Sequence, residues 1–132
     1  MEISTILTAG LSPDPNIRKQ AEKTIEQYAS QNFAGFLMSC AIELSDETKI
    51  SSNRQLAATL IKNMLLHMPI FLGKWDQLPS LEKNKIKNNI LSTLASQEKD
   101  IRKAAALVVA GTFILNSKGY VKLSYQRKNG LI

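Results

Sequence analysis

The stretch RQLAATLIKNMLLHM, residues 54–68, decides the fold of this chain. From Ala57 to Met68 its apolar residues recur at i, i+3, i+4, i+7, i+8 and i+11, which is one continuous face of an α-helix. Leu56 and Leu66 add apolar surface on a second side. We therefore expect a helix that is buried on two sides, as an internal helix of a repeat protein would be.

An arginine followed three residues later by an alanine that begins an apolar helical face occurs three times in the chain. The three instances are Arg18/Ala21, Arg54/Ala57 and Arg102/Ala105. Their separations of 36 and 48 residues average about 42, which is the period of paired-helix repeats of the HEAT and armadillo type. One such repeat cannot bury its own apolar face, and stacked repeats form extended surfaces that bind other proteins. The sequence thus predicts an all-α fold, a right-handed α-solenoid of antiparallel helix pairs.

Further helices are expected on both sides of this stretch. Asp14-Pro15 is a helix start signal, and apolar spacing predicts helices over 15–30, 33–44 and 80–94 and from Ile101 onward. We interpret 15–30 with 33–44 as the first pair and 51–68 with 80–94 as the second pair. The helix from Ile101 then opens a third repeat, which gives about two and a half repeats. Residues 69–80 are expected to form a connection in which Trp75 closes the end of a helix pair.

The last repeat lacks a second helix in this interpretation, so its apolar face would be uncapped. The residues concerned are Ile101, Ala104, Ala105, Val108, Val109, Phe113 and Leu115. We expect this face to be covered, either by the end of the chain folding back or by a second copy in a homodimer. Residues 111–132 show no sustained period. The chain is therefore divided into a helical-repeat domain, 1–110, and a divergent basic tail, 111–132, which is partly disordered or docked on the open end.

The composition excludes several classes of protein. An apolar fraction of 44% supports a packed core, and one cysteine with one histidine is too few for a disulfide framework or a Cys/His metal cluster. The start has no basic n-region and the longest apolar run, 104–115, is too short to span a bilayer. We expect a soluble protein of a reducing compartment. No catalytic or cofactor-binding motif is found, and the carboxylates Glu22 and Glu26 are interpreted as surface charge. An enzyme is not predicted.

The net charge of +6 raises the question of nucleic-acid binding. Lys118, Lys122, Arg127 and Lys128 follow residue 116 with no acid among them, which leaves only +2 for residues 1–116. A second basic zone, 83–103, is diluted by acidic residues and lacks the interleaved aromatics of single-strand binders. A solvated helix face explains it better, so no direct nucleic-acid binding is expected.

Three motifs carry a resemblance to a known family. They are AEKTIEQ at 21–27, RQLAATLIKN at 54–63, and Lys74-Trp75 followed by the helix over 80–94. Their order and spacing over residues 1–110 resemble the N-terminal domain of importin-β (karyopherin-β) family nuclear transport receptors. Residues 1–7 are most similar to the branch that gives the family its name. The similarity ends at about Gly111, which supports treating 111–132 as a segment outside the family pattern.

The resemblance implies HEAT repeats and a part in protein import into the nucleus, with a location in cytoplasm and nucleus and at the nuclear pore. Receptors of this family bind the GTP form of the small GTPase Ran through their N-terminal repeats. Phe-Gly nucleoporins and cargo or importin-α would be bound through further repeats that this chain does not contain.

In such a solenoid the second helix of each pair lines the inner face. We expect these second helices at residues 32–44 and 81–94. The candidate Ran-binding residues on the polar faces of these two helices are Ser39, Glu43, Lys83, Lys87 and Asn88. Two further candidates are Lys62 and Asn63, the polar residues that interrupt the apolar 54–68 stretch. The alternative function is a stand-alone helical adaptor that binds acidic proteins or RNA through the 83–103 zone and the tail. That function would show a steep loss of affinity with salt.

Overall fold

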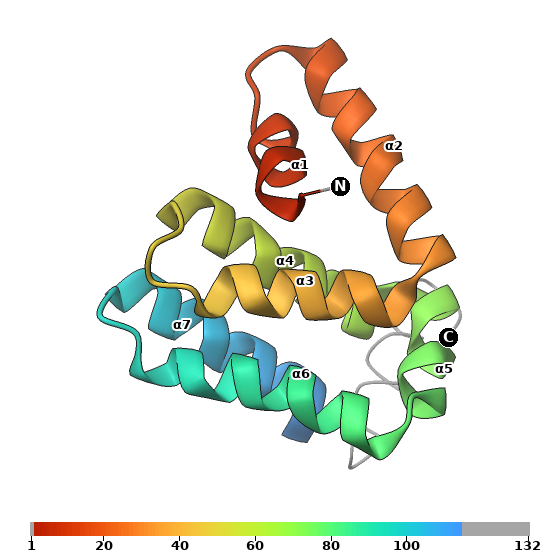
Figure 1. The fold of residues 1–132 in the computed structure, drawn as a ribbon, viewed down its shortest axis with the longest axis vertical. Helices are drawn as coiled ribbons and strands as arrows, with labels where there is room; N and C mark the ends of the chain where they lie inside the picture. The colour runs from red at the N-terminus through yellow and green to blue at the C-terminus, as the bar shows by residue number, and fades with distance from the viewer. Residues whose placement is uncertain (1, 115–132) are drawn as a thin grey trace, which may run out of the picture.

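The computed structural model describes residues 2–114, and this part of the chain is entirely helical (Figure 1). Its elements are α1 (Ile3–Gly10), α2 (Pro15–Gln31), α3 (Phe33–Ser45), α4 (Ser51–His67), α5 (Pro69–Gln77), α6 (Ser80–Ser92), the 3₁₀ turn η1 (Thr93–Ala95), α7 (Lys99–Val108) and the π-helical turn η2 (Val109–Ile114). No helix of the described residues is long and apolar enough to cross a membrane. The predicted all-α class and the HEAT-type solenoid are confirmed.

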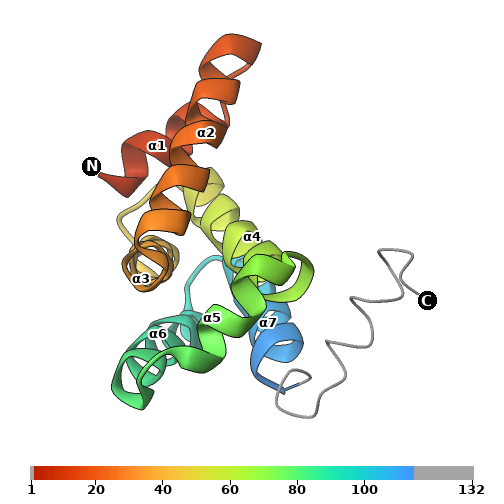
Figure 2. The ribbon, with the colours of Figure 1, turned by 90° about the vertical axis from the view of Figure 1, so that its right-hand side faces the viewer.

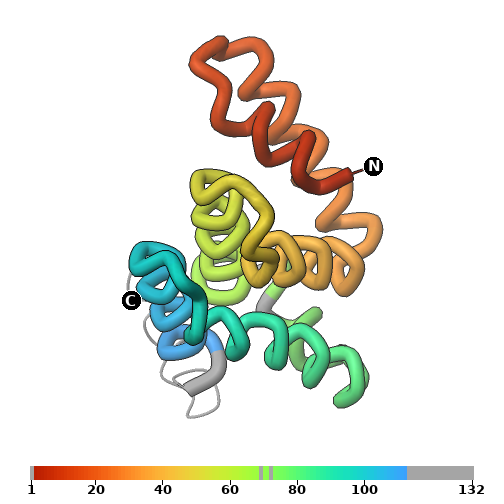
Figure 3. Tube along the Cα trace, turned by 60° about the vertical axis from the view of Figure 1, so that its left-hand side comes forward, coloured from red at the N-terminus to blue at the C-terminus, as the bar shows by residue number. Residues whose placement is uncertain are grey.

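The helices form three antiparallel pairs, α1/α2, α3/α4 and α6/α7, stacked one on the next (Figures 1 and 3). The first helices α1, α3 and α6 lie in one layer, and the second helices α2, α4 and α7 lie in the other (Figure 2). Within the stack α3 packs on α6 and α4 packs on α7.

This pairing is shifted by one helix from the prediction. Helix α3 was assigned as the second helix of the first pair, but it packs most extensively on α4 and is the first helix of its own pair. In the same way α7 is the partner of α6 and does not open a new repeat. The Arg/Ala signature therefore marks the second helix of each pair.

The repeated arginine has one structural role at all three positions. Arg18 donates from Nη1 to the Ser12 carbonyl at 3.1 Å, and Arg54 donates from Nε to the Leu44 carbonyl at 2.9 Å. Arg102 donates from Nη1 to the Ser96 carbonyl at 2.8 Å. In each case the acceptor lies where the first helix of the pair ends or in the loop that follows it. The signature thus ties the second helix of each pair to the end of the first helix or to the loop between them, through a hydrogen bond to a backbone carbonyl.

The core is centred on α3 and α4, as predicted. The stripe from Phe33 to Leu44 and the stripe from Ala57 to Leu65 pack against each other, and Leu37 and Ile61 are fully buried between them. Leu60 is only partly buried and packs at the edge of the core. Local signals set the helix starts: Asp14 accepts a hydrogen bond from the Asn16 amide at 2.9 Å ahead of α2. Asn32 caps α3 in the same manner.

The predicted connection over residues 69–80 is largely helical. Helix α5 begins at a proline, which is compatible with the first helical position because that residue needs no amide donor. Phe71 and Trp75 are buried, and the Phe71 ring stacks on Phe33 at a centroid distance of 5.4 Å. Trp75 belongs to the core cluster. With α5 included, residues 2–114 contain seven α-helices.

The face predicted to be uncapped at the end of the chain is mostly internal. Ile101, Ala105 and Val108 are buried, and α7 packs on α4. The face was expected to be bare because α7 was assigned to a repeat without a partner helix. The exposed large apolar residues of the last pair are Leu81, Leu91, Leu94 and Leu107. The side chain of Phe113 and the whole of Leu115 lie outside the described residues.

Candidate partner-binding surface

Only two of the seven predicted site residues lie on a second helix. Lys62 and Asn63 are half-buried on α4, in the layer of second helices. The other five lie on first helices, Ser39 and Glu43 on α3 and Lys83, Lys87 and Asn88 on α6. Their assignment to second helices was wrong because it followed from the shifted pairing.

Several of these five side chains have internal partners. Ser39 is hydrogen-bonded to the Tyr28 hydroxyl at 3.1 Å, and Lys83 donates to the Asp76 carbonyl at 3.2 Å. The Lys87 ammonium lies 6.0 Å from the centroid of the Trp75 ring, within the range of a cation–π interaction. Asn88 is exposed. Lys83 and Lys87 thus help to hold α5 against α6.

Glu43 was expected on a polar face, but only 1% of it is exposed. Its Oε1 accepts a hydrogen bond from the Ser4 hydroxyl at 2.7 Å, whereas Oε2 has no hydrogen-bond partner among the described residues. Glu43 lies beside a pocket of about 570 Å³ between α1 and the α3–α4 loop, where Asn53 donates to the Thr8 hydroxyl at 2.9 Å. This polar cluster joins the first pair to the second, and Glu43 is not available as a surface contact.

One groove brings together residues of the second-helix layer. The inner groove lies between α2 and α4 and continues onto α5, with a volume of about 250 Å³. Its lining residues are Glu22, Ile25, Glu26, Ala29, Leu60, Asn63, Met64, Met68 and Phe71. Figure 2 shows α2, α4 and α5 on this side of the molecule.

The inner groove combines an apolar floor with a polar rim. Ala29, Met64 and Phe71 are buried below it, while Glu22 and Glu26 stand exposed on the α2 side. Asn63 contributes an amide from α4. No ion pair to either carboxylate occurs within residues 2–114. Such a groove suits the binding of a protein segment, because apolar side chains can enter it while polar groups orient them at the rim.

Of these lining residues, Asn63 was among the candidates predicted from the sequence, whereas Glu22 and Glu26 were not. Glu22 and Glu26 were interpreted as ordinary surface charge, since four-residue spacing places both on one side of α2. The sequence signal that could have indicated a groove is Ile25, an apolar residue that lies between the two carboxylates on the same side of α2.

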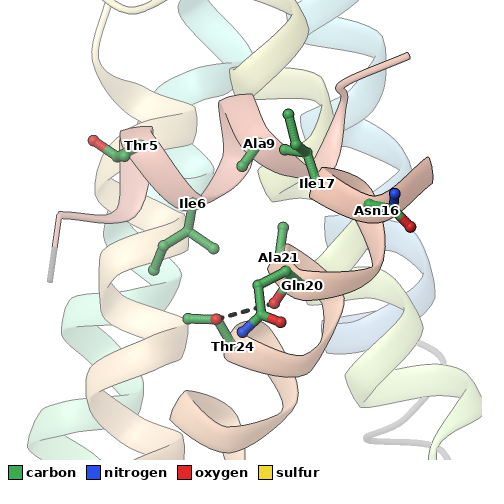
Figure 4. Close-up of a pocket in the computed structure, with 8 residues that line it drawn as sticks. All are labelled: Thr5, Ile6, Ala9, Asn16, Ile17, Gln20, Ala21 and Thr24. Carbon is green, nitrogen blue, oxygen red and sulfur yellow. Dashed lines mark hydrogen bonds between the residues drawn. The ribbon is translucent and has the colours of Figure 1, made fainter. Parts of the chain in front are cut away.

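A second groove lies at the N-terminal end of the stack, between α1 and α2. Figure 4 shows Ile6, Ala9, Ile17 and Ala21 facing this space of about 410 Å³. Thr24 lies at its edge and donates to the Gln20 carbonyl of its own helix at 3.0 Å. The surface that lines this groove is almost entirely apolar, so it offers little polar recognition.

Charge in the α3–α4 loop is organised by Arg54, which is fully buried. Its Nη1 lies 2.8 Å from Glu98 Oε2 and 3.1 Å from Glu47 Oε2. The Ser96 hydroxyl and then the Arg54 guanidinium hold the pKa of the Glu47 carboxyl below its ordinary value. Hydrogen bonds from Thr48 lower the pKa of Asp46 in the same loop. Burial, followed by the negative charge of Glu43, raises the pKa of the Cys40 thiol.

The stacked helix pairs define a helical-repeat protein of the α-solenoid type. A family model described as the importin-beta N-terminal domain matches residues 21–96. The chain is 36% identical over 115 residues to importin subunit beta-1 of Arabidopsis thaliana and 36% identical over 106 residues to that of Saccharomyces cerevisiae. This chain belongs to the importin-β family, as the sequence motifs indicated.

Solved structures agree with this assignment. Yeast importin-beta, Kap95p, superposes with a TM-score of 0.77 at 34% identity, covering 83% of this chain and 14% of the yeast chain. A structure of Kap95p with RanGDP matches with a TM-score of 0.76 at 34% identity, again over 83% of this chain and 14% of the yeast chain. The Arabidopsis match covers 83% of this chain and 13% of the relative. The chain thus spans about one seventh of the relatives that it matches.

Proposed function

We propose that this chain acts in protein import into the nucleus by binding Ran, preferentially in its GTP state, through the second-helix layer α2, α4 and α7. The observation that carries the proposal is the match of the helix stack to Kap95p, a protein that has been solved with RanGDP. Lys62 and Asn63 are the contact residues we favour, because they lie on α4 in that layer. Ser39, Lys83, Lys87 and Asn88 remain candidates with less support from their position.

Further partners follow the same reasoning. Kap95 has also been solved in a complex with Nup1, which supports nucleoporins as partners of the longer relatives. Nucleoporin and cargo binding by this chain would need surfaces that its relatives carry elsewhere in their length. We place the protein in cytoplasm and nucleus and at the nuclear pore on the strength of its family.

Nucleotide dependence is the property that tests the Ran proposal. The full chain is immobilised and titrated with Ran loaded with GTP or with GDP. We expect weak binding with a preference for the GTP form, because the chain has about one seventh of the length of its relatives. Equal affinity for both nucleotide states would remove the receptor function from this chain.

A charge reversal locates the contact. Lys62→Glu is expected to weaken binding to Ran-GTP about tenfold, which corresponds to about 1.4 kcal/mol. Lys85→Glu is the matched control, since Lys85 is exposed on the first-helix layer, and it should leave the affinity unchanged. Circular dichroism checks that both variants keep their helical content. Equal loss in the two variants would place the contact elsewhere.

The adaptor alternative and the homodimer are tested with the same material. Binding to RNA or to an acidic protein that falls steeply with salt would favour the adaptor.

The homodimer now rests on the exposed Leu91, Leu94 and Leu107 of the last pair. Sedimentation velocity at micromolar concentration should show a dimer that Leu107→Lys dissociates, and a monomer in the parent chain would contradict it.

A further inference from the structure

The inner groove has the properties of a docking site for a short cationic segment. Its floor is apolar, and its only charged lining residues among those described are the carboxylates Glu22 and Glu26. Met64 and Met68, which line it on α4 and at the start of α5, can adjust to irregular shapes because methionine side chains are flexible. The volume of about 250 Å³ lies near the lower limit of small-molecule pockets. It suits a few side chains better than a whole ligand.

The chain itself contains a segment with the complementary chemistry. Residues 115–132 include Lys118, Lys122, Arg127 and Lys128, no acid, and several aromatic and aliphatic residues. Its net positive charge is opposite to that of Glu22 and Glu26 at the rim of the inner groove. Opposite charges steer and orient a bound segment more than they add affinity.

The described chain ends close to the groove. A β-carbon placed on Gly111 would come 2.8 Å from the Leu66 Cδ1, so η2 lies against the last turns of α4. The same turns supply Asn63 and Met64 to the groove. The path from one side of α4 to the other is about 10–12 Å, one helix diameter. A fully extended chain of 18 residues reaches roughly 60 Å, and tethering provides a millimolar effective concentration.

We propose that residues 115–132 bind in the inner groove, with lysines of this segment against Glu22 and Glu26 and apolar side chains on the floor between α2 and α4.

A paramagnetic label on the segment tests this directly in the full chain. Cys40 is the single cysteine, and its burial and raised pKa make it a poor nucleophile. Ser124→Cys can therefore carry a nitroxide selectively. We expect loss of most of the amide NMR signal over residues 22–29 and 60–64, with recovery when the nitroxide is reduced. Signals near Thr8 and Lys49, on the opposite side of the first two pairs, should be unaffected.

A pair of double variants identifies the groove as the site. Glu22→Gln with Glu26→Gln should restore the signals over residues 22–29. Asp76→Asn with Glu82→Gln is the matched control, since these acids are exposed on α5 and α6, and it should leave the signal loss in place. Signal loss that survives in the Glu22/Glu26 variant, or that falls around Leu107 instead, would overturn the proposal.

A mixed sample separates this arrangement from pairing between copies. Isotope-labelled chain without nitroxide is combined with unlabelled chain that carries it. Loss over residues 22–29 in the mixture would assign the occupant to a second copy and overturn the intramolecular site, whereas intact signals support it.

One consequence rests on the proposed function, because the segment would compete with Ran for the same layer. Lys118→Glu with Lys122→Glu should then raise the affinity for Ran-GTP several-fold and also abolish the signal loss. Abolished signal loss with unchanged Ran affinity would refute the competition and leave the docking intact. If Ran binds neither the parent chain nor the double variant, the proposed function is refuted and the docking proposal is not.

Discussion

Arg54 shows most directly how one residue holds several segments of this fold together. Its guanidinium is fully buried and donates to the Leu44 carbonyl, the Ser96 hydroxyl and the carboxylates Glu47 and Glu98. Removing a charge from water is costly unless hydrogen bonds replace its hydration. The rigid fork of arginine meets that requirement here, and one side chain joins the α3–α4 loop to the segment before α7.

The fork geometry leads to a prediction about stability. Arg54→Lys keeps the charge but cannot form this set of hydrogen bonds, so the free energy of unfolding should fall by about 2–4 kcal/mol. Arg18→Lys is the control, because Arg18 is exposed and, within residues 2–114, its side chain donates to the Ser12 carbonyl alone. It should cost less than about 1 kcal/mol. Urea unfolding measures both, and equal losses would show that burial of Arg54 has no special role.

The acids of the α3–α4 loop predict how stability depends on pH. Asp46 and Glu47 have folded-state pKa values below their ordinary values of 3.8 and 4.5. Their contribution is therefore complete above those ordinary values and is lost as pH falls through the lower folded values. Glu47→Gln should flatten the decline in stability below about pH 4.5, measured by urea unfolding at a series of pH values. An unchanged acid slope would contradict the prediction.

At the scale of elements, the helices were predictable because their signals are local. The stripe over α3 and the stripe over α4 follow from the spacing of apolar residues, and both faces are buried as expected. The order of pairing was not predictable in the same way. A single residue, Asn32, separates α2 from α3, whereas four and five residues separate the helices within the first two pairs. Short links therefore occur both within and between pairs, and length alone does not distinguish them.

Helix α5 and the inner groove were missed for related reasons. A proline is read as an end signal, yet at the first position of a helix it is a favourable start. Glu22 and Glu26 line a groove only because α4 and α5 lie beside α2. The sequence of α2 alone does not distinguish two acids at the edge of a groove from two acids on an open surface. Asn63 was found from its motif, not from its surroundings.

Leu37 and Leu60, one from each of the two central apolar stripes, should differ in their effect on stability. Leu37 on α3 is fully buried, whereas Leu60 on α4 is partly buried at the inner groove. Leu37→Ala should lower the free energy of unfolding by about 2–5 kcal/mol, as for other buried leucines. Leu60→Ala should cost roughly half as much, since less apolar area is lost from the interior. Urea unfolding compares them, and a larger loss for Leu60 would contradict the packing described.

At the scale of the whole molecule, burial is distributed unevenly along the stack. The central pair α3/α4 contributes eleven residues to the buried core cluster, while Leu7 and Ala29 are the members from α1/α2. The first pair is joined to the second by these contacts and by the polar cluster of Ser4, Glu43 and Asn53. In repeat proteins stability is roughly a sum of units and their interfaces, so the first pair has the smaller share.

This distribution predicts where the native structure opens first. Amide hydrogen exchange under native conditions should show α1 and α2 opening at least about tenfold more often than α3 and α4, a difference of roughly 1.4 kcal/mol. Leu7→Ala removes a fully buried side chain of α1 and should increase exchange in α1 and α2 while α3 and α4 keep their protection. Leu107→Ala is a control at the other end of the stack, where the side chain is 62% exposed, and it should leave the exchange of α1 and α2 unchanged. Uniform protection across α1 to α4, with a uniform loss in Leu7→Ala, would show instead that the pairs unfold as one cooperative unit.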